Sequence, residues 1–198
     1  MIAKMKTERA ALGFRVKSGW AVLILIGGSV RSPRLYQNGI INLSDPRNPE
    51  ARQPYHAAMG KLETNATRLK RRIHDVRCTT ERSIVDLLAQ YMENGYVIRR
   101  AALVVGSVID PYSIANPHIR AHALEGRLFR TTLEGALRSR GIHCSLFTER
   151  DAYAVATKSL GLSTGRIRDM LANLGRAVAG PWRADQKLAA LAAWMALR

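Results

Sequence analysis

Apolar and polar positions divide this chain into short strands and longer helices. Residues 101–109 form an apolar run that is rich in β-branched side chains and closed by Asp110-Pro111, which predicts a strand buried on both faces in the middle of a sheet. The next helix begins at Asn116-Pro117, an N-cap residue followed by proline, and ends near Gly141. We expect this strand and this helix to form the centre of the domain.

Three antiparallel strands are predicted before this centre, over residues 11–26, 29–36 and 40–43. Gly27-Gly28 separates the first two, and Asn38-Gly39, a strong hairpin signal, joins the last two. A fifth strand is expected over residues 142–147. Helices are expected over residues 55–74, 80–94, 149–160, 164–176 and 184–197.

The predicted order is three antiparallel strands, helices, a strand, a helix, a strand and helices, which is the order of the ribonuclease H-like fold. We therefore expect an α/β domain with a mixed five-stranded sheet, three antiparallel strands and then two parallel ones, flanked by helices. At 198 residues the chain suits a single domain over residues 11–198, after a flexible basic segment at residues 1–10. No Gly-x-Gly-x-x-Gly or Gly-x-x-x-x-Gly-Lys motif is present, so a mononucleotide-binding loop is not supported.

The chain is strongly basic, because it has 31 Lys and Arg residues but only 15 Asp and Glu residues, which gives a formal net charge of +16. Such an excess favours polyanions, and nucleic acid, either DNA or RNA, is the expected partner. The alternative is a basic surface that is merely solvated. The candidates for phosphate contacts are Arg71, Arg72, Arg127, Arg130, Arg166 and Arg168.

Other features narrow the class of protein. No apolar stretch reaches the roughly 18 residues of a membrane span, and the apolar run near the N-terminus lacks the small-x-small pattern of a signal-peptide cleavage site. We therefore expect a cytoplasmic protein, with a homo-oligomer left open. Cys78 and Cys144 have neither metal-ligand nor redox spacing, and we expect them to be reduced and buried.

Three polar residues, His118, His122 and Glu125, follow the core strand with the spacing i, i+4, i+7, which assigns them to the sheet-facing side of the helix. Open α/β sheets bind ligands at this end of their strands. The three side chains are either buried polar groups or a site for a divalent zinc, manganese or iron ion, or else for phosphate or acid–base chemistry. His56 either approaches them from a neighbouring loop or is exposed, and Asp110 either adds a carboxylate or forms a turn.

Residues 11–21, ALGFRVKSGWA, and residues 182–193, WRADQKLAALAA, resemble the first strand and the last helix of the RuvC-type Holliday-junction resolvases, and Ser163-Thr164-Gly165 resembles the turn before their penultimate helix. The resemblance implies acids that hold two divalent ions at the scissile phosphate. This chain departs from that pattern. Arg15 stands at the first-strand aspartate, the core-strand glutamate falls near Gly106 or Ser107, and Leu188 stands at the second aspartate of the last helix, so that Asp185 alone matches.

Taken together, these observations predict a nucleic-acid-associated protein that lacks the standard two-metal nuclease acids. Two other functions stay open. One is a metal-dependent hydrolase built on His118, His122 and Glu125, with Asp110 or His56 added. The other is a structural or interaction domain without catalysis.

Overall fold

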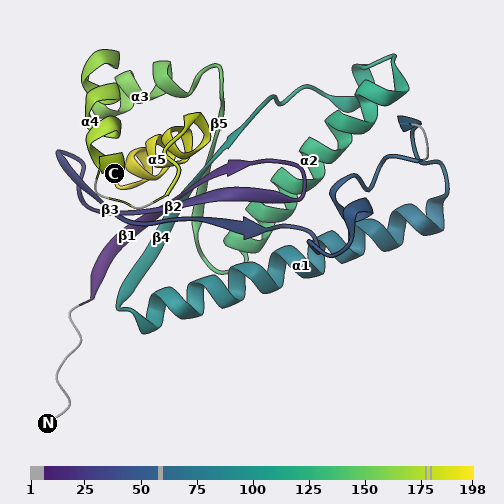
Figure 1. Cartoon of the computed structure of the whole chain (residues 1–198), viewed down its shortest axis with the longest axis horizontal. Helices are drawn as coiled ribbons and strands as arrows, with labels where there is room; N and C mark the ends of the chain where they lie inside the picture. Colours follow the sequence, from purple (N-terminus) through teal and green to yellow (C-terminus); the bar gives the residue numbers. More distant parts are fainter. Residues whose placement is uncertain (1–6, 58–59, 177, 179) are drawn as a thin grey trace, which may run out of the picture.

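Five strands form one mixed sheet in the order β3-β2-β1-β4-β5 (Figure 1). The computed structural model describes residues 7–57, 60–176, 178 and 180–198. The strands are β1 (Glu8–Val16), β2 (Trp20–Ser29), β3 (Ser32–Asn42), β4 (Tyr96–Val105) and β5 (His143–Thr148). β1, β2 and β3 pair antiparallel, whereas β4 pairs parallel with both β1 and β5. The expected mixed sheet is confirmed. β1 begins at Glu8, so residues 8–10 of the segment 1–10 that was expected to be flexible belong to the sheet, and residues 1–6 lie outside the described part of the chain.

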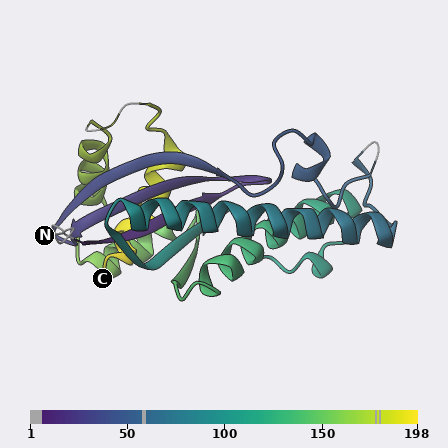
Figure 2. The ribbon, with the colours of Figure 1, turned by 90° about the horizontal axis from the view of Figure 1, so that it is seen from below.

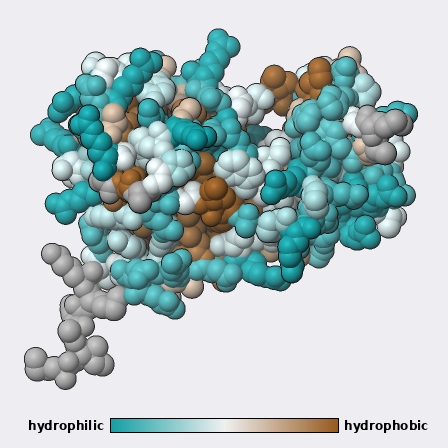
Figure 3. All heavy atoms as spheres, in the orientation of Figure 1, coloured by the Kyte–Doolittle hydropathy of each residue, from teal (hydrophilic) through white to brown (hydrophobic). Residues whose placement is uncertain are grey.

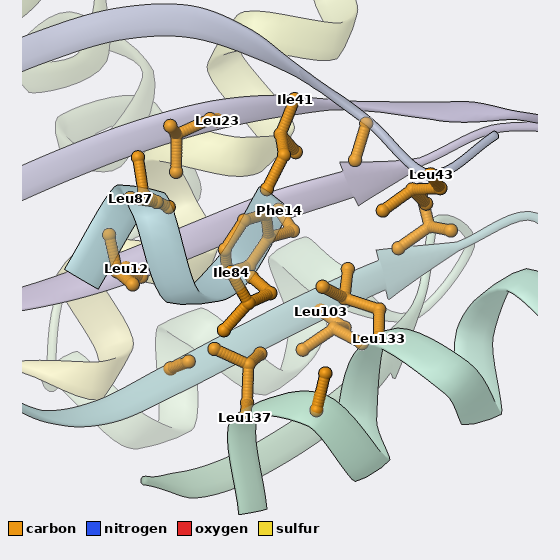
Figure 4. Close-up of a cluster of buried hydrophobic side chains, with 14 of the residues drawn as sticks. Leu12, Phe14, Leu23, Ile41, Leu43, Ile84, Leu87, Leu103, Leu133 and Leu137 are labelled. Carbon is orange, nitrogen blue, oxygen red and sulfur yellow. The ribbon is translucent and has the colours of Figure 1, made fainter. Parts of the chain in front are cut away.

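Helices cover both faces of the sheet. α1 (Ala66–Glu93) and α2 (Pro117–Arg138) pack on one face, and α3 (Ala152–Leu160), α4 (Thr164–Arg176) and α5 (Ala184–Ala196) pack on the other. Successive strand residues point to opposite faces, so Leu103 joins the first core and Val104 the second. Figure 4 shows the first core, where Phe14 and Leu103 meet Ile84 of α1 and Leu133 of α2.

The turns between the first three strands differ from the prediction. Asn38 and Gly39 lie inside β3, paired with Ile24 and Leu23 of β2, so the expected hairpin at Asn38-Gly39 is wrong. A two-residue turn at Asn-Gly requires positive φ, which Gly39 does not adopt. Positive φ occurs instead at Gly19 (84°), where the chain turns and divides the expected strand 11–26 into β1 and β2. Gly27 and Gly28, which were expected to form the next turn, lie inside β2, and the chain turns at residues 30–31.

The two helices expected over residues 55–74 and 80–94 are one helix, α1, which begins only at Ala66. Its apolar stripe continues through the expected break at residues 77–79, because Val76, Thr80 and Ile84 are all buried at a spacing of four. The α-helix does not extend back to residue 55, because Gly60 has a φ of +72° and His56 pairs with Leu62 in an antiparallel bridge. Residues 49–57 and 60–63, which we call the His56 loop, therefore precede the helix.

Two further expectations need correction. β4 ends at Val105, and Val108 and Ile109 of the predicted core strand are 50% and 60% exposed. Cys78 is an exposed thiol, not a buried one, and Cys144 is half-buried. Of the helices that the structure describes, none has the length and hydropathy that crossing a membrane requires.

The first turns of α1 and α2 extend side by side beyond the ends of the strands (Figure 2). α2 begins as predicted, because the Asn116 side chain accepts hydrogen bonds from the amides of His118 and Ile119 and Pro117 follows it. This overhang is where the His56 loop meets α2.

Candidate functional site

Three histidines from two segments meet at the overhang. His118 and His122 lie one turn apart on α2, and His56 comes from the loop after β3. One ring nitrogen of each lies within 4.8 Å of those of the other two, and the His56 and His122 ring centroids are 4.4 Å apart. His56 is buried, whereas His118 and His122 are exposed and do not face the sheet as the helix periodicity predicted.

Arg72 of α1 holds the His56 loop in place. Its guanidinium is buried and donates to the His56 carbonyl oxygen at 2.9 Å, and it forms ion pairs with Glu50 at 2.6 Å and Glu63 at 3.5 Å. Arg72 was expected to contact phosphate. Its donors are instead committed to this loop, which carries His56.

Glu125 is completely buried behind the histidines. One carboxylate oxygen, Oε1, accepts from the His56 ring Nδ1 at 2.7 Å and from the Tyr55 amide at 3.2 Å, and the other, Oε2, lies 3.6 Å from Nδ1 of His122. Burial raises the pKa of Glu125 to about 7, although the Tyr55 amide and the nearby histidines lower it in part. Burial also lowers the pKa of His56. Glu125, which the sequence predicted as the third metal ligand, therefore lies behind the histidines and bonds to His56. His56 is the third member of the cluster in its place.

A second feature is a pocket of about 270 Å³ at the carboxyl ends of β1 and β4. Its lining includes residues 15–18, residues 105–109 and the α2 residues His122, Ala123, Gly126, Arg127 and Arg130. The charged groups in this lining are Arg15, Lys17, Arg127 and Arg130, and no carboxylate lines the pocket in the described part of the chain. Because His122 belongs to both features, the pocket and the histidine cluster adjoin.

Arg15 and Lys17 are neutralised by acids just outside this lining. The buried Arg15 guanidinium lies 2.5 Å from a carboxylate oxygen of Glu149 and 3.5 Å from one of Asp185, and the Lys17 ammonium lies 2.9 Å from Asp185. Glu149 was missed in the sequence. It directly follows β5, whose carboxyl end lies beside that of the parallel strand β4, and this topology would have indicated it.

The remaining site residues predicted from the sequence do not line this pocket. The Asp110 side chain accepts the Tyr112 amide and so forms the predicted turn. Arg71 is exposed on α1, and Arg166 and Arg168 are exposed on α4, which covers the opposite face of the sheet. Of the six predicted phosphate contacts, the pocket contains Arg127 and Arg130.

No protein-family model matches the sequence, and no curated protein is similar to it in sequence. Among solved structures, Thermus thermophilus RuvC in complex with a Holliday junction substrate aligns with a TM-score of 0.54 and 11% identity over 94% of this chain and 91% of that chain. A second structure of Thermus thermophilus RuvC gives the same TM-score and identity over 94% and 92%. The yeast mitochondrial Holliday junction resolvase Ydc2 aligns at 0.48 and 11% over 98% and 80%. The chain therefore has the ribonuclease H-like fold found in RuvC, as the sequence resemblance implied.

Proposed function

We propose that this protein binds the phosphate backbone of DNA or RNA in the pocket at the carboxyl ends of β1 and β4, and that it does not cut the strand by the two-metal mechanism. The observation that carries the proposal is the lining of this pocket, whose charged side chains are all cationic. Cationic side chains attract phosphate oxygens and repel metal ions. The structural similarity to RuvC, whose Thermus structure contains a Holliday junction, supports nucleic acid as the source of the phosphate.

The two divalent ions that the resemblance implies do not fit the residues at this edge. A two-metal site needs several carboxylate oxygens converging on ions about 4 Å apart. Here Asp185 and Glu149 both form ion pairs with the guanidinium of Arg15. The guanidinium would repel a divalent cation, so we assign no metal-dependent step to this edge.

Arg127 and Arg130 are the cations that remain for a ligand. Neither forms an ion pair with any residue that the structure describes, and their spacing of three aligns them along one side of α2. Guanidinium groups bind phosphate oxygens through paired, directed hydrogen bonds. We therefore assign the main phosphate contact to these two arginines.

Binding of labelled duplex, single-stranded and four-way-junction DNA across a salt series tests this proposal. Arg127→Ala/Arg130→Ala should weaken binding and reduce the salt slope of log K by about 1 for each phosphate that the variant no longer neutralises. Arg166→Ala/Arg168→Ala is the matched control, because it removes the same charge from α4 on the opposite face. Absence of binding at about 50 mM salt, or equal losses of affinity for the two double variants, contradicts the proposal.

A further inference from the structure

We propose that His56, His118 and His122 form a binding site for one divalent transition-metal ion of the zinc class, with Glu125 as the carboxylate that orients His56 from behind. The site does not depend on nucleic acid binding, since its ligands are not the arginines that we assign to phosphate. It differs from the set His118, His122 and Glu125 indicated by the helix periodicity, because the His56 loop supplies the third ligand.

Hydrogen bonds at the Nδ1 atoms of His118 and His56 fix which nitrogen of these two rings is free. The His118 Nδ1 lies 2.9 Å from the Gly60 carbonyl oxygen, which only accepts, so this Nδ1 carries the hydrogen. The His56 Nδ1 faces the Glu125 carboxylate at 2.7 Å, and the His122 Nδ1 lies 3.6 Å from the other oxygen of the same group. In the neutral rings of His56 and His118 the lone pair is therefore on Nε2, and the Gly60 carbonyl and the Glu125 carboxylate are outer partners typical of metal-bound histidines.

The His56 Nε2 is the ring nitrogen without a protein partner among the described residues. The His56 Nε2 is buried and forms no hydrogen bond, which costs free energy unless a ligand meets it. The Nε2 atoms of His118 and His122 lie 3.3 Å apart, at hydrogen-bond distance from each other. Two nitrogens bound to a tetrahedral zinc ion at about 2.0–2.1 Å lie about 3.3–3.4 Å apart, so this pair already has the separation of two zinc ligands.

The chemistry of the donors selects the class of ion. Three neutral imidazoles suit zinc, cobalt, nickel or copper, whereas magnesium and calcium prefer oxygen ligands. Three protein ligands leave one tetrahedral position open, as in catalytic zinc sites. Because the exposed His118 and His122 rings can rotate, the remaining separations of up to 4.8 Å can close around an ion.

The test is calorimetric titration of the chelator-treated full chain with zinc chloride, with cobalt chloride as a spectroscopic probe. We expect one equivalent to bind, with a cobalt absorption spectrum of low coordination number. His118→Ala and His122→Ala should each lose the tight binding and the metal-induced rise in melting temperature. These two exposed side chains decide the test, because the buried His56 is needed for packing as well.

Matched controls come from the other histidines. His143→Ala removes an exposed histidine of β5 and should bind metal as the wild type does. His74 and Cys78 on α1 could also bind a metal ion, because the His74 Nε2 lies 3.4 Å from the Cys78 sulfur. His74→Ala removes this pair and should also bind metal as the wild type does. Tight binding that survives the removal of His118 and His122, or that disappears with His74, overturns the proposal.

Glu125→Gln separates the orienting role from packing. The amide keeps the size of the carboxyl group but not its charge, and removal of such an outer partner typically lowers metal affinity about 10- to 100-fold. An unchanged affinity contradicts the role given to Glu125. Arg127→Ala/Arg130→Ala should retain the metal, so this proposal and the nucleic-acid proposal can fail separately.

Discussion

At the carboxyl end of β1, the buried Arg15 guanidinium lies between the carboxylates of Glu149 and Asp185. A cation between converging acids neutralises them as a bound metal ion would. It is covalently part of the chain, so it can neither leave nor bind a water molecule for attack. Arg15 thus makes this an edge whose acids are already neutralised, and the nearby Arg127 and Arg130 line the pocket beside it.

This arrangement predicts that purified protein does not cleave four-way junctions in magnesium, and that Asp185→Asn changes nothing in that assay. The Asp185 carboxylate already pairs with Arg15 and Lys17, so it has little capacity left for a metal ion. The measurement is gel analysis of labelled junction strands over a range of magnesium concentrations. Magnesium-dependent cutting that Asp185→Asn abolishes would show that the edge is a nuclease centre.

Arg15→Met should destabilise the fold by about 1–2 kcal/mol, measured by urea unfolding. Breaking a fully buried ion pair costs about 3–5 kcal/mol. Here the side chains of Glu149 and Asp185 are 49% and 32% exposed, so water can solvate the acids left behind. Arg166→Met, at an exposed position of α4, should change stability by less than about 0.5 kcal/mol. A destabilisation by Arg15→Met that is no larger than that of this control would mean that the pairs contribute nothing.

At the scale of elements, α5 positions Asp185 because it lies directly on the sheet. A Cβ added at Gly13 of β1 would lie 1.9 Å from the Ala189 carbonyl oxygen and 2.5 Å from the Ala193 amide nitrogen. The alanine-rich sequence of α5 and the glycine of β1 together allow this close approach. The ion pair between Arg15 and Asp185 depends on it.

Gly13→Ala should therefore destabilise the protein by about 1–3 kcal/mol or more, because the added carbon meets helix backbone that cannot rotate away. Gly135→Ala is the control within α2, where a Cβ would meet nothing within 4 Å. It should stabilise by about 0.4–1 kcal/mol. Thermal and urea unfolding of both variants measure the difference, and a neutral Gly13→Ala would mean that α5 is not held against β1.

The His56 loop gives a second prediction at this scale. Arg72→Ala removes the hydrogen bond to the His56 carbonyl and the ion pairs to Glu50 and Glu63, so it should weaken zinc binding. Arg71→Ala removes the exposed neighbouring arginine and should leave the affinity unchanged. Equal affinities of the two variants in the calorimetric titration would exclude a positioning role for Arg72.

Over the whole molecule, the net charge of +16 is spread widely, and Figure 3 shows hydrophilic side chains over most of one face. Long-range attraction then favours any polyanion, and in our proposal the pocket is the place where a phosphate is held. Phosphate contacts carry no direct base information. We therefore expect the protein to recognise the phosphate backbone and the shape of the nucleic acid, and not its base sequence.

We therefore expect duplexes of equal length and unrelated sequence to bind with dissociation constants within about threefold of one another, because phosphate contacts are the same in each. Competition titrations with shuffled sequences measure this. A preference of about 1000-fold for one sequence would indicate direct base contacts instead.

The sequence by itself determined the order of strands and helices, because hydrophobic periodicity and capping residues act within one element. Asn116 and Pro117 begin α2 where predicted, and the apolar runs became β1, β2 and β4. Hairpin turns were less predictable, since the pairing of β2 with β3 overrode the local signal at Asn38-Gly39.

Only the tertiary structure decided how the histidine cluster and Glu125 come together. His56 joins His118 and His122 because Arg72, sixteen residues further along the chain, holds its loop against α2. Glu125 lies behind the histidines because the overhang of α2 packs beneath that loop and not on the sheet. These are contacts between segments far apart in the sequence, and residue spacing within one helix contains no information about which loop will cover it.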